Sequence, residues 1–145
     1  MSAIINRACL ERIETGHHQC LLCGDDNPWS LKLRFSTGGN GIVSARFVAH
    51  DMLQGYQGMV HGGVVAALLD AAMTNCLFQC GVKAVTGDLH IRYLRPVPCQ
   101  QTLDIHASVE KATPKLYRMK SEIRDRDHLL ARADAVFIPW KKHTT

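Results

Sequence analysis

Residues 61–73 read HGGVVAALLDAAM, and they lie inside an apolar stretch that extends from Met59 to Gly81. Their composition predicts a long helix from about residue 62 to residue 79, with Gly81 at its end. Apolar side chains occupy nearly every face of that helix, whereas a surface helix has a polar side. Other parts of the chain must therefore cover most of the helix, and this requirement decides the fold.

The start of the predicted helix and its single carboxylate indicate a chemistry. Gly62 and Gly63 leave backbone N–H groups bare at the helix N-terminus, where the helix dipole also favours negative charge. Asp70 is the only carboxylate in the apolar stretch, and burying a charge costs free energy unless partners compensate for it. Donors for a developing oxyanion, together with a base that activates water, suggest acyl transfer.

The rest of the chain predicts strands on both sides of the helix. Residues 31–35 alternate apolar and polar side chains, and a glycine-rich turn at 37–41 joins them to a second strand at 42–48, as in a hairpin. Four extended stretches follow the helix, at 84–94, 102–112, 116–124 and 129–138. We therefore expect an α+β domain in which one antiparallel sheet curls around a central helix.

Length and composition narrow the class of protein. The 145 residues suit one domain, 1–145, in which residues 1–19 form an N-terminal extension with a helix over residues 3–13. The net charge of +4 comes from dispersed Lys and Arg, which argues against a nucleic-acid partner. No continuous apolar run reaches the roughly 20 residues of a membrane span, and the charged N-terminus is unlike an export signal. Six cysteines then predict free thiols and a cytoplasmic location.

Several motifs together resemble a known family. They are Cys-Leu-Leu-Cys-Gly at 20–24 with Asn27-Pro28, GYQGMVHGG at 55–63, Asp70, and DLHIRYLRP at 88–96. The combination is similar to hotdog-fold thioesterases of the phenylacetate-pathway (PaaI-like) type, over most of the chain. The resemblance implies hydrolysis of an acyl-CoA thioester by a homodimer or homotetramer. It implies no metal and no cofactor, since coenzyme A enters only as part of the substrate.

The resemblance also implies roles for individual residues. Asp70 would act as general base or nucleophile, the N–H of Gly62, helped by Gly63, would hold the oxyanion, and His61 would shape that loop and contact the substrate. Thr86 would orient the water or Asp70. Residues expected to contact the substrate or its coenzyme A are Gln57, Asp88, His90, Arg92 and Arg95. The acyl chain would lie in a slot lined by helix residues such as Val64, Leu68 and Met73.

Spacing along the helix adds an independent constraint. Eight residues separate Gly62 from Asp70, or about 12 Å along a helix axis, whereas a hydrogen bond reaches about 3 Å. Either Asp70 takes no part in the chemistry, or the Gly62 donor comes from a second subunit in a C2 dimer, which we favour. Strict alternation along 84–94 places Thr86 on the face away from the helix. Thr86 would then join the site only near the strand's end or across the dimer junction.

Other interpretations of the same residues remain open. His61 can be a helix cap, and Asp70 a buried acid with a structural partner. A hotdog dehydratase or hydratase would also use a histidine and an acid, and a non-catalytic acyl-CoA-binding module could share the fold. His17, His18, Cys20 and Cys23 are residue types that suit zinc. Adjacent histidines would have difficulty reaching one ion, however, so we expect a thiol-rich structural turn and no metal.

Overall fold

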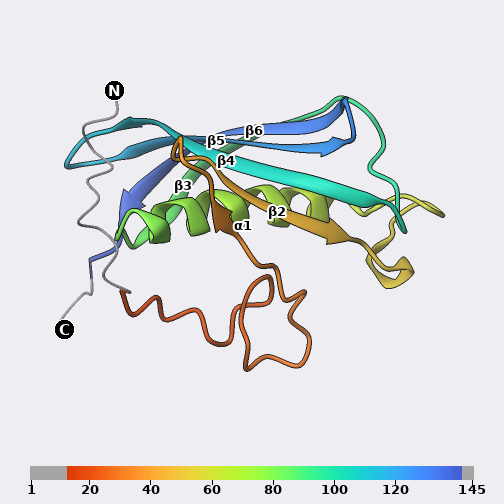
Figure 1. Ribbon diagram of the computed structural model, residues 1–145, viewed down its shortest axis with the longest axis horizontal. Coiled ribbons are helices and arrows are strands. Elements are labelled where there is room, and N and C mark those ends of the chain that lie inside the picture. Colours follow the sequence, from red (N-terminus) through yellow and green to blue (C-terminus); the bar gives the residue numbers. More distant parts are fainter. Residues whose placement is uncertain (1–12, 142–145) are drawn as a thin grey trace.

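The computed structural model describes residues 13–141, which form one antiparallel sheet around one long helix (Figure 1). The strands are β1 (Ser36–Thr37), β2 (Val43–Val48), β3 (Ala84–Tyr93), β4 (Thr102–Ala112), β5 (Tyr117–Asp125) and β6 (His128–Pro139). The helix α1 (Gly62–Gln79) follows a short 3-10 turn, η2 (Asp51–Leu53). The strand order is β1-β2-β4-β5-β6-β3, with every neighbouring pair antiparallel. The predicted hotdog arrangement is confirmed, as are the helix and its four following strands.

The core lies between α1 and the concave face of the sheet. Leu68, Leu69 and Met73 on α1 are completely buried, and they share one hydrophobic cluster with Ile123 on β5 and Phe137 on β6. Truncating a buried leucine or phenylalanine in such a core to alanine typically costs about 2–5 kcal/mol. This packing fixes the rotation of α1, and therefore decides which helix residues remain at the surface.

The segment 13–35 covers the side of α1 that faces away from the sheet (Figure 1). The backbone N–H groups of Leu31 and Leu33 donate to the carbonyls of Leu21 and Leu22, at 2.9 and 3.0 Å. Those bonds replace pairing with β2, and Lys32 has a positive φ of 56° that interrupts the extended backbone. The predicted strand at 31–35 is therefore wrong: of residues 31–37, only Ser36 and Thr37 pair with β2.

The predicted N-terminal helix over residues 3–13 lies outside the described residues, except for Ile13, which is not helical. Within the described part of the chain, α1 has the length and mean hydropathy (1.2 over 18 residues) of a helix able to cross a membrane. A core helix beneath a sheet has the same composition, because its buried face must also be apolar. The packing of α1 against the sheet accounts for that hydropathy.

A β-bulge in β3 changes which residues face the helix. The register with β6 shifts between Thr86 and Asp88, so Thr86 pairs with the buried Phe137 and lies on the helix side of the sheet. The predicted face of Thr86 is therefore wrong, because one extra residue reverses the alternation that the sequence suggests. Gly87 supplies that residue: a Cβ there would lie 3.0 Å from Cγ1 of Ile138 and 3.3 Å from the carbonyl oxygen of Val136.

Candidate active site

Asp70 and Thr86 form a hydrogen-bonded pair between α1 and β3. The hydroxyl Oγ1 of Thr86 donates to Oδ1 of Asp70 at 2.5 Å, because the bulge at Gly87 turns Thr86 toward the helix. Asp70 is half-buried and not sealed in the core, and Thr86 is exposed. Within the described residues no protein donor reaches the second carboxylate oxygen. That oxygen is consequently open to water or to a bound substrate.

The first turn of α1 presents one unpaired backbone donor. His61 caps the helix, and its Nδ1 accepts the Gly63 N–H at 2.9 Å, while its carbonyl accepts the N–H groups of Val64 and Val65. The Gly63 N–H is therefore occupied by the cap, whereas the expected pairing with Gly62 needs it free. Among residues 13–141, the Gly62 N–H contacts no acceptor. His61 must carry its ring proton on Nε2, because Nδ1 accepts.

Tyr93 is a contributor to this turn that the sequence analysis did not identify. Its hydroxyl donates to the Gly62 carbonyl at 2.7 Å, which fixes the peptide unit next to the unpaired N–H. Tyr93, Gly62 and Arg95 line a pocket of about 310 Å³ together with residues of the loop before α1 and the turn after β3. The Tyr-x-Arg-Pro sequence at 93–96 was the available signal, since it placed a hydroxyl two residues before Arg95.

The other residues expected to contact coenzyme A do not line the pocket that contains Arg95 in a single subunit. Asp88, His90 and Arg92 pair with β6 residues on the outer face of the sheet, opposite the helix. Gln57 is exposed in the loop before α1, and its side chain makes no hydrogen bond to protein among residues 13–141. Of the five expected contacts, Arg95 alone lies beside Gly62 in a single subunit.

Gly62 and Asp70 remain apart in one subunit because both belong to the same continuous helix. They are the first and ninth residues of α1, and a rise of about 1.5 Å per residue keeps their backbones roughly 12 Å apart. Asp70 faces the same side of the molecule as β3, which is an outer strand of the sheet. One chain therefore holds two separate half-sites: a carboxylate with its threonine, and a helix N-terminus with Tyr93 and Arg95.

The expected acyl slot differs from the observed surface. Leu68 and Met73 are completely buried beneath the sheet and cannot line an open slot. Val64, in contrast, lines an apolar groove of about 640 Å³ between α1, the end of β2 and the segment 13–35. Trp29 and Met52 form part of its rim, with 82% and 87% of their surfaces exposed.

The five cysteines within residues 13–141 divide into a core group and a cluster outside the core. Cys76 and Cys99 are buried and Cys80 is half-buried, in keeping with small core residues. Cys20 and Cys23 lie beside His17 in the segment 13–35, whereas His18 turns away and bonds Glu14 at 2.8 Å. Burial raises the pKa of the Cys23 thiol to about 11, and burial lowers the pKa of His17.

A family model and individual relatives of known name point to the same family. The sequence model of the thioesterase superfamily matches residues 57–131, which are more than half of the chain. This range contains both half-sites. The acyl-coenzyme A thioesterase THEM4 of Mus musculus is 32% identical over 88 residues, which cover 59% of this chain. The chain spans only 38% of the length of that relative.

Solved structures share the fold. The crystal structure of a thioesterase superfamily protein superimposes with a TM-score of 0.75 at 25% identity, covering 79% of this chain and 60% of that one. The Escherichia coli PaaI protein from the phenylacetic acid degradation operon has a TM-score of 0.70 at 20% identity, covering 79% and 84%. A Streptococcus mutans protein bound to acetyl CoA also has a TM-score of 0.70 at 20% identity, covering 77% and 91%.

Proposed function

The chain belongs to the thioesterase superfamily, and we propose on that basis that it hydrolyses an acyl-CoA thioester to the free acid and coenzyme A. The hydrogen bond between Thr86 and Asp70 is the observation that carries the proposal. It holds a carboxylate in one orientation at the surface of an apolar helix, with its second oxygen available for chemistry. A module that only binds acyl-CoA has no need of such a carboxylate.

Asp70 acts either as a general base or as a nucleophile. As a base it takes a proton from water while the water oxygen bonds to the thioester carbonyl carbon. The tetrahedral intermediate then expels the thiolate of coenzyme A, which receives the proton from Asp70. As a nucleophile Asp70 bonds to that carbon itself, the C–S bond breaks and the thiolate of coenzyme A leaves, and water then hydrolyses the resulting mixed anhydride to the free acid and the Asp70 carboxylate. Thr86 fixes the carboxylate orientation in both routes, and the thiolate is a good leaving group that needs no strong acid.

The Gly62 N–H stabilises the oxyanion that forms in either route. A helix N-terminus adds a favourable dipole to that hydrogen bond, and Tyr93 holds the peptide that follows it. Since Gly62 and Asp70 of one subunit lie too far apart, the Gly62 donor comes from a second subunit. Each dimer then has two composite sites, related by C2 symmetry. A homodimer, or a dimer of such dimers, meets this requirement.

The two ends of the substrate occupy different surfaces. Arg95 in the pocket beside Gly62 offers a guanidinium group that suits a phosphate of coenzyme A. The apolar groove between α1, the end of β2 and the segment 13–35 is lined by Val64 and by Ala67, which lies three residues before Asp70 on α1, and it accommodates the acyl group. Replacing Ala67 by leucine narrows that groove, so we expect weaker turnover of long acyl chains with little change for acetyl-CoA.

The primary experiment measures thiol release from short-chain, medium-chain and aryl acyl-CoAs by the wild type and by Asp70→Asn. The substitution removes the base but keeps the size of the side chain and its ability to accept from Thr86. We expect turnover to collapse while circular dichroism and oligomeric state stay unchanged. Asp127→Asn, in the turn between β5 and β6, is the matched control and should retain full activity.

Two outcomes would overturn the proposal. Undiminished hydrolysis by the folded Asp70→Asn variant would remove Asp70 from the mechanism. Binding of acyl-CoA by the wild type without turnover of any thioester would favour a non-catalytic acyl-CoA-binding module.

A further inference from the structure

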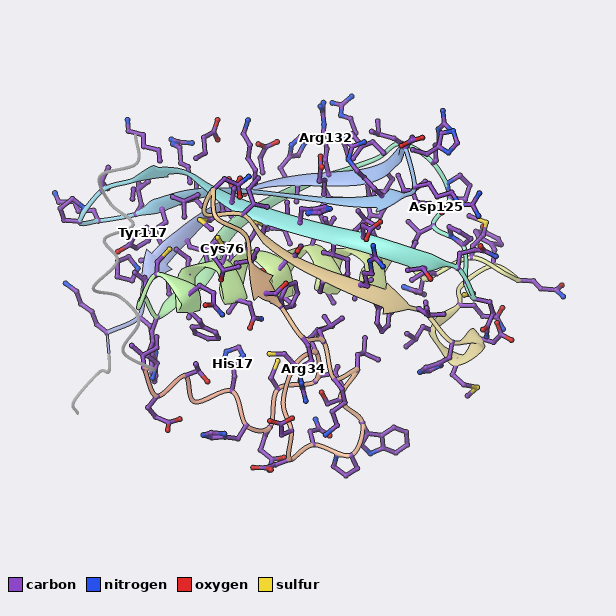
Figure 2. All side chains as sticks on the ribbon, viewed as in Figure 1. His17, Arg34, Cys76, Tyr117, Asp125 and Arg132 are labelled. Carbon is purple, nitrogen blue, oxygen red and sulfur yellow. The ribbon has the colours of Figure 1, made fainter. Side chains whose placement is uncertain are left out.

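Three side chains of metal-ligating types converge in the segment 13–35, and none of them belongs to the Asp70–Thr86 pair or to the Gly62 turn. The ligand atoms of His17, Cys20 and Cys23 all lie within 4.8 Å of one another, and Nδ1 of His17 is 3.7 Å from Sγ of Cys23. All three side chains are half-buried. His17 and Arg34 both lie on the side of α1 opposite the sheet (Figure 2). Nothing in the proposed hydrolysis uses this cluster.

The backbone of residues 20–24 forms a tight turn that directs both sulfurs to one side. The Gly24 N–H donates to the Cys20 carbonyl at 2.9 Å, and the Leu22 N–H donates to Sγ of Cys20 at 3.3 Å. A Cβ on residue 24 would overlap the backbone nitrogen of Cys20 and lie 2.5 Å from the His18 carbonyl oxygen. Only glycine fits that position. An N–H group that donates to sulfur stabilises the charged thiolate form, which is the form that binds metals.

The helix α1 supports the same cluster from the other side. The amide of Asn75 donates to Sγ of Cys23 at 3.6 Å, and a second bond to the Ala71 carbonyl, at 2.8 Å, fixes its orientation. The ring of Phe78 packs edge-on against His17, with 4.8 Å between the ring centroids. Contacts of this kind orient the side chains that bind the metal in known metal sites. The cluster is thus held by two separate elements of the fold.

We propose that His17, Cys20 and Cys23 bind one Zn²⁺ ion, with the fourth coordination position open to solvent. Zinc takes thiolate sulfur at about 2.3 Å and imidazole nitrogen at about 2.0–2.1 Å in a tetrahedron, which places ligand atoms roughly 3.5–3.8 Å apart. The observed separation of 3.7 Å between Cys23 and His17 already fits that geometry. A hollow of about 350 Å³ adjoins His17 and Cys23, and gives water access to the fourth position.

The structure answers the objection to a zinc site that the adjacent histidines His17 and His18 raised in the sequence. Two adjacent histidines would have difficulty reaching one ion, but His18 bonds Glu14, so His17 alone belongs to the cluster. Two thiolates balance the charge of Zn²⁺, and thiolate with imidazole is a ligand set that zinc favours. The ion would cross-link residues 17, 20 and 23 within the segment 13–35, and Asn75 and Phe78 would hold that cross-linked turn against α1. Since that segment forms one wall of the apolar groove, zinc would stabilise the groove without touching the reacting atoms.

The test measures bound zinc in the full chain, purified without a histidine tag, under reducing conditions and without chelators. We expect about one equivalent of zinc per chain, and less than about a tenth of that in Cys23→Ser and His17→Gln. The matched controls are Cys80→Ser, which removes a thiol outside the cluster, and His18→Gln. Both should retain the ion. Replacing zinc by Co²⁺ should give the sulfur-to-cobalt charge-transfer absorption and intense visible bands of a tetrahedral thiolate site.

If a variant fails to fold, metal binding by the wild type, including its Co²⁺ absorption spectrum, still decides the test. Wild-type protein that takes up neither Zn²⁺ nor Co²⁺ while its thiols titrate as free would overturn the proposal. A disulfide between Cys20 and Cys23 in protein purified with reductant, recognised by a mass lower by two hydrogens, would overturn it as well. Equal zinc content in Cys23→Ser and Cys80→Ser would place the ion elsewhere, with the same consequence.

Discussion

Thr86 gives the proposed reaction its most local test, because its hydroxyl is the single side-chain donor observed on Asp70. Thr86→Val removes the hydroxyl and keeps the shape of the side chain. A hydrogen bond to a charged group contributes about 1.5–3 kcal/mol, so we expect kcat for thioester hydrolysis to fall roughly 10- to 100-fold. Thr86→Ser retains the donor and should keep most of the activity. Equal rates for the valine and serine variants would show that the bond has no role in turnover.

His61 permits the structural and chemical roles of one residue to be separated. His61→Ala removes the acceptor for the Gly63 N–H, and loss of an N-cap costs about 0.5–2 kcal/mol. His61→Asn restores a capping acceptor and should recover the free energy of unfolding, measured by urea titration at one fixed chain concentration. Hydrolysis by the stable asparagine variant then reports any contact between Nε2–H and the substrate. Equal stability of the alanine and asparagine variants would contradict the assigned cap.

At the scale of an element, the bulge in β3 determines whether Thr86 can reach the helix. Gly87→Ala places a Cβ about 3.0 Å from Cγ1 of Ile138, so the local strand must shift. We expect lower thioesterase activity and a lower melting temperature. Ile138 is partly exposed on the outer face, and the double variant Gly87→Ala/Ile138→Ala removes the nearer clash. It should recover part of the lost activity. Failure of the second substitution to help would mean that the Val136 carbonyl, not Ile138, limits the bulge.

Elements differ in how far their sequences predict them. The helix and the four strands after it were predicted within a few residues, because their apolar periodicity reflects burial in the core that was formed. Residues 31–35 alternate like a strand, but their N–H groups bond to Leu21 and Leu22, which lie ten or eleven positions earlier. An alternation of apolar and polar residues indicates which side chains are buried, but it does not indicate which segment the backbone N–H groups bond to. Gly87 inside a strand is a signal for a bulge. Without that bulge, the alternation put Thr86 on the wrong face of the sheet.

For the candidate site too, the sequence predicted which residues take part better than it predicted their hydrogen bonds. Asp70 and Gly62 were recognisable from residue type and spacing, and Arg95 from the motif that resembles the family; in the structure Gly62 and Arg95 are exposed and Asp70 is half-buried. The occupation of the Gly63 N–H by His61 depends on a side-chain rotamer that no spacing fixes. The bond of Tyr93 to Gly62 joins residues 31 positions apart. The Tyr93 bond follows from how β3 and α1 pack, and so appears only once the fold is formed, whereas the cap at His61 is a local contact that the sequence offered as one alternative.

At the scale of the whole molecule, the division of the site into two halves predicts a specific behaviour of mixed subunits. Gly62→Pro removes the N–H that we propose as the oxyanion donor but preserves the helix, because proline is well tolerated at the first helical position and His61 already has an extended ψ of 135°. Losing one oxyanion donor costs about 10²–10³ in kcat. We therefore expect Gly62→Pro and Asp70→Asn to be nearly inactive when each is purified alone.

Unfolding the two variants together in equal amounts and refolding them should restore activity. A mixed dimer has one site with both defects and one site with Asp70 from the proline subunit and Gly62 from the asparagine subunit. With random pairing, half of the dimers are mixed, and half of their sites are intact, so the recovered activity is roughly a quarter of the wild-type value. A site contained in one subunit cannot regain activity by mixing, and a refolded pair as inactive as its parents would exclude the composite arrangement. Size-exclusion chromatography of the same samples checks that dimers have formed, so that inactivity cannot be attributed to unassembled chains.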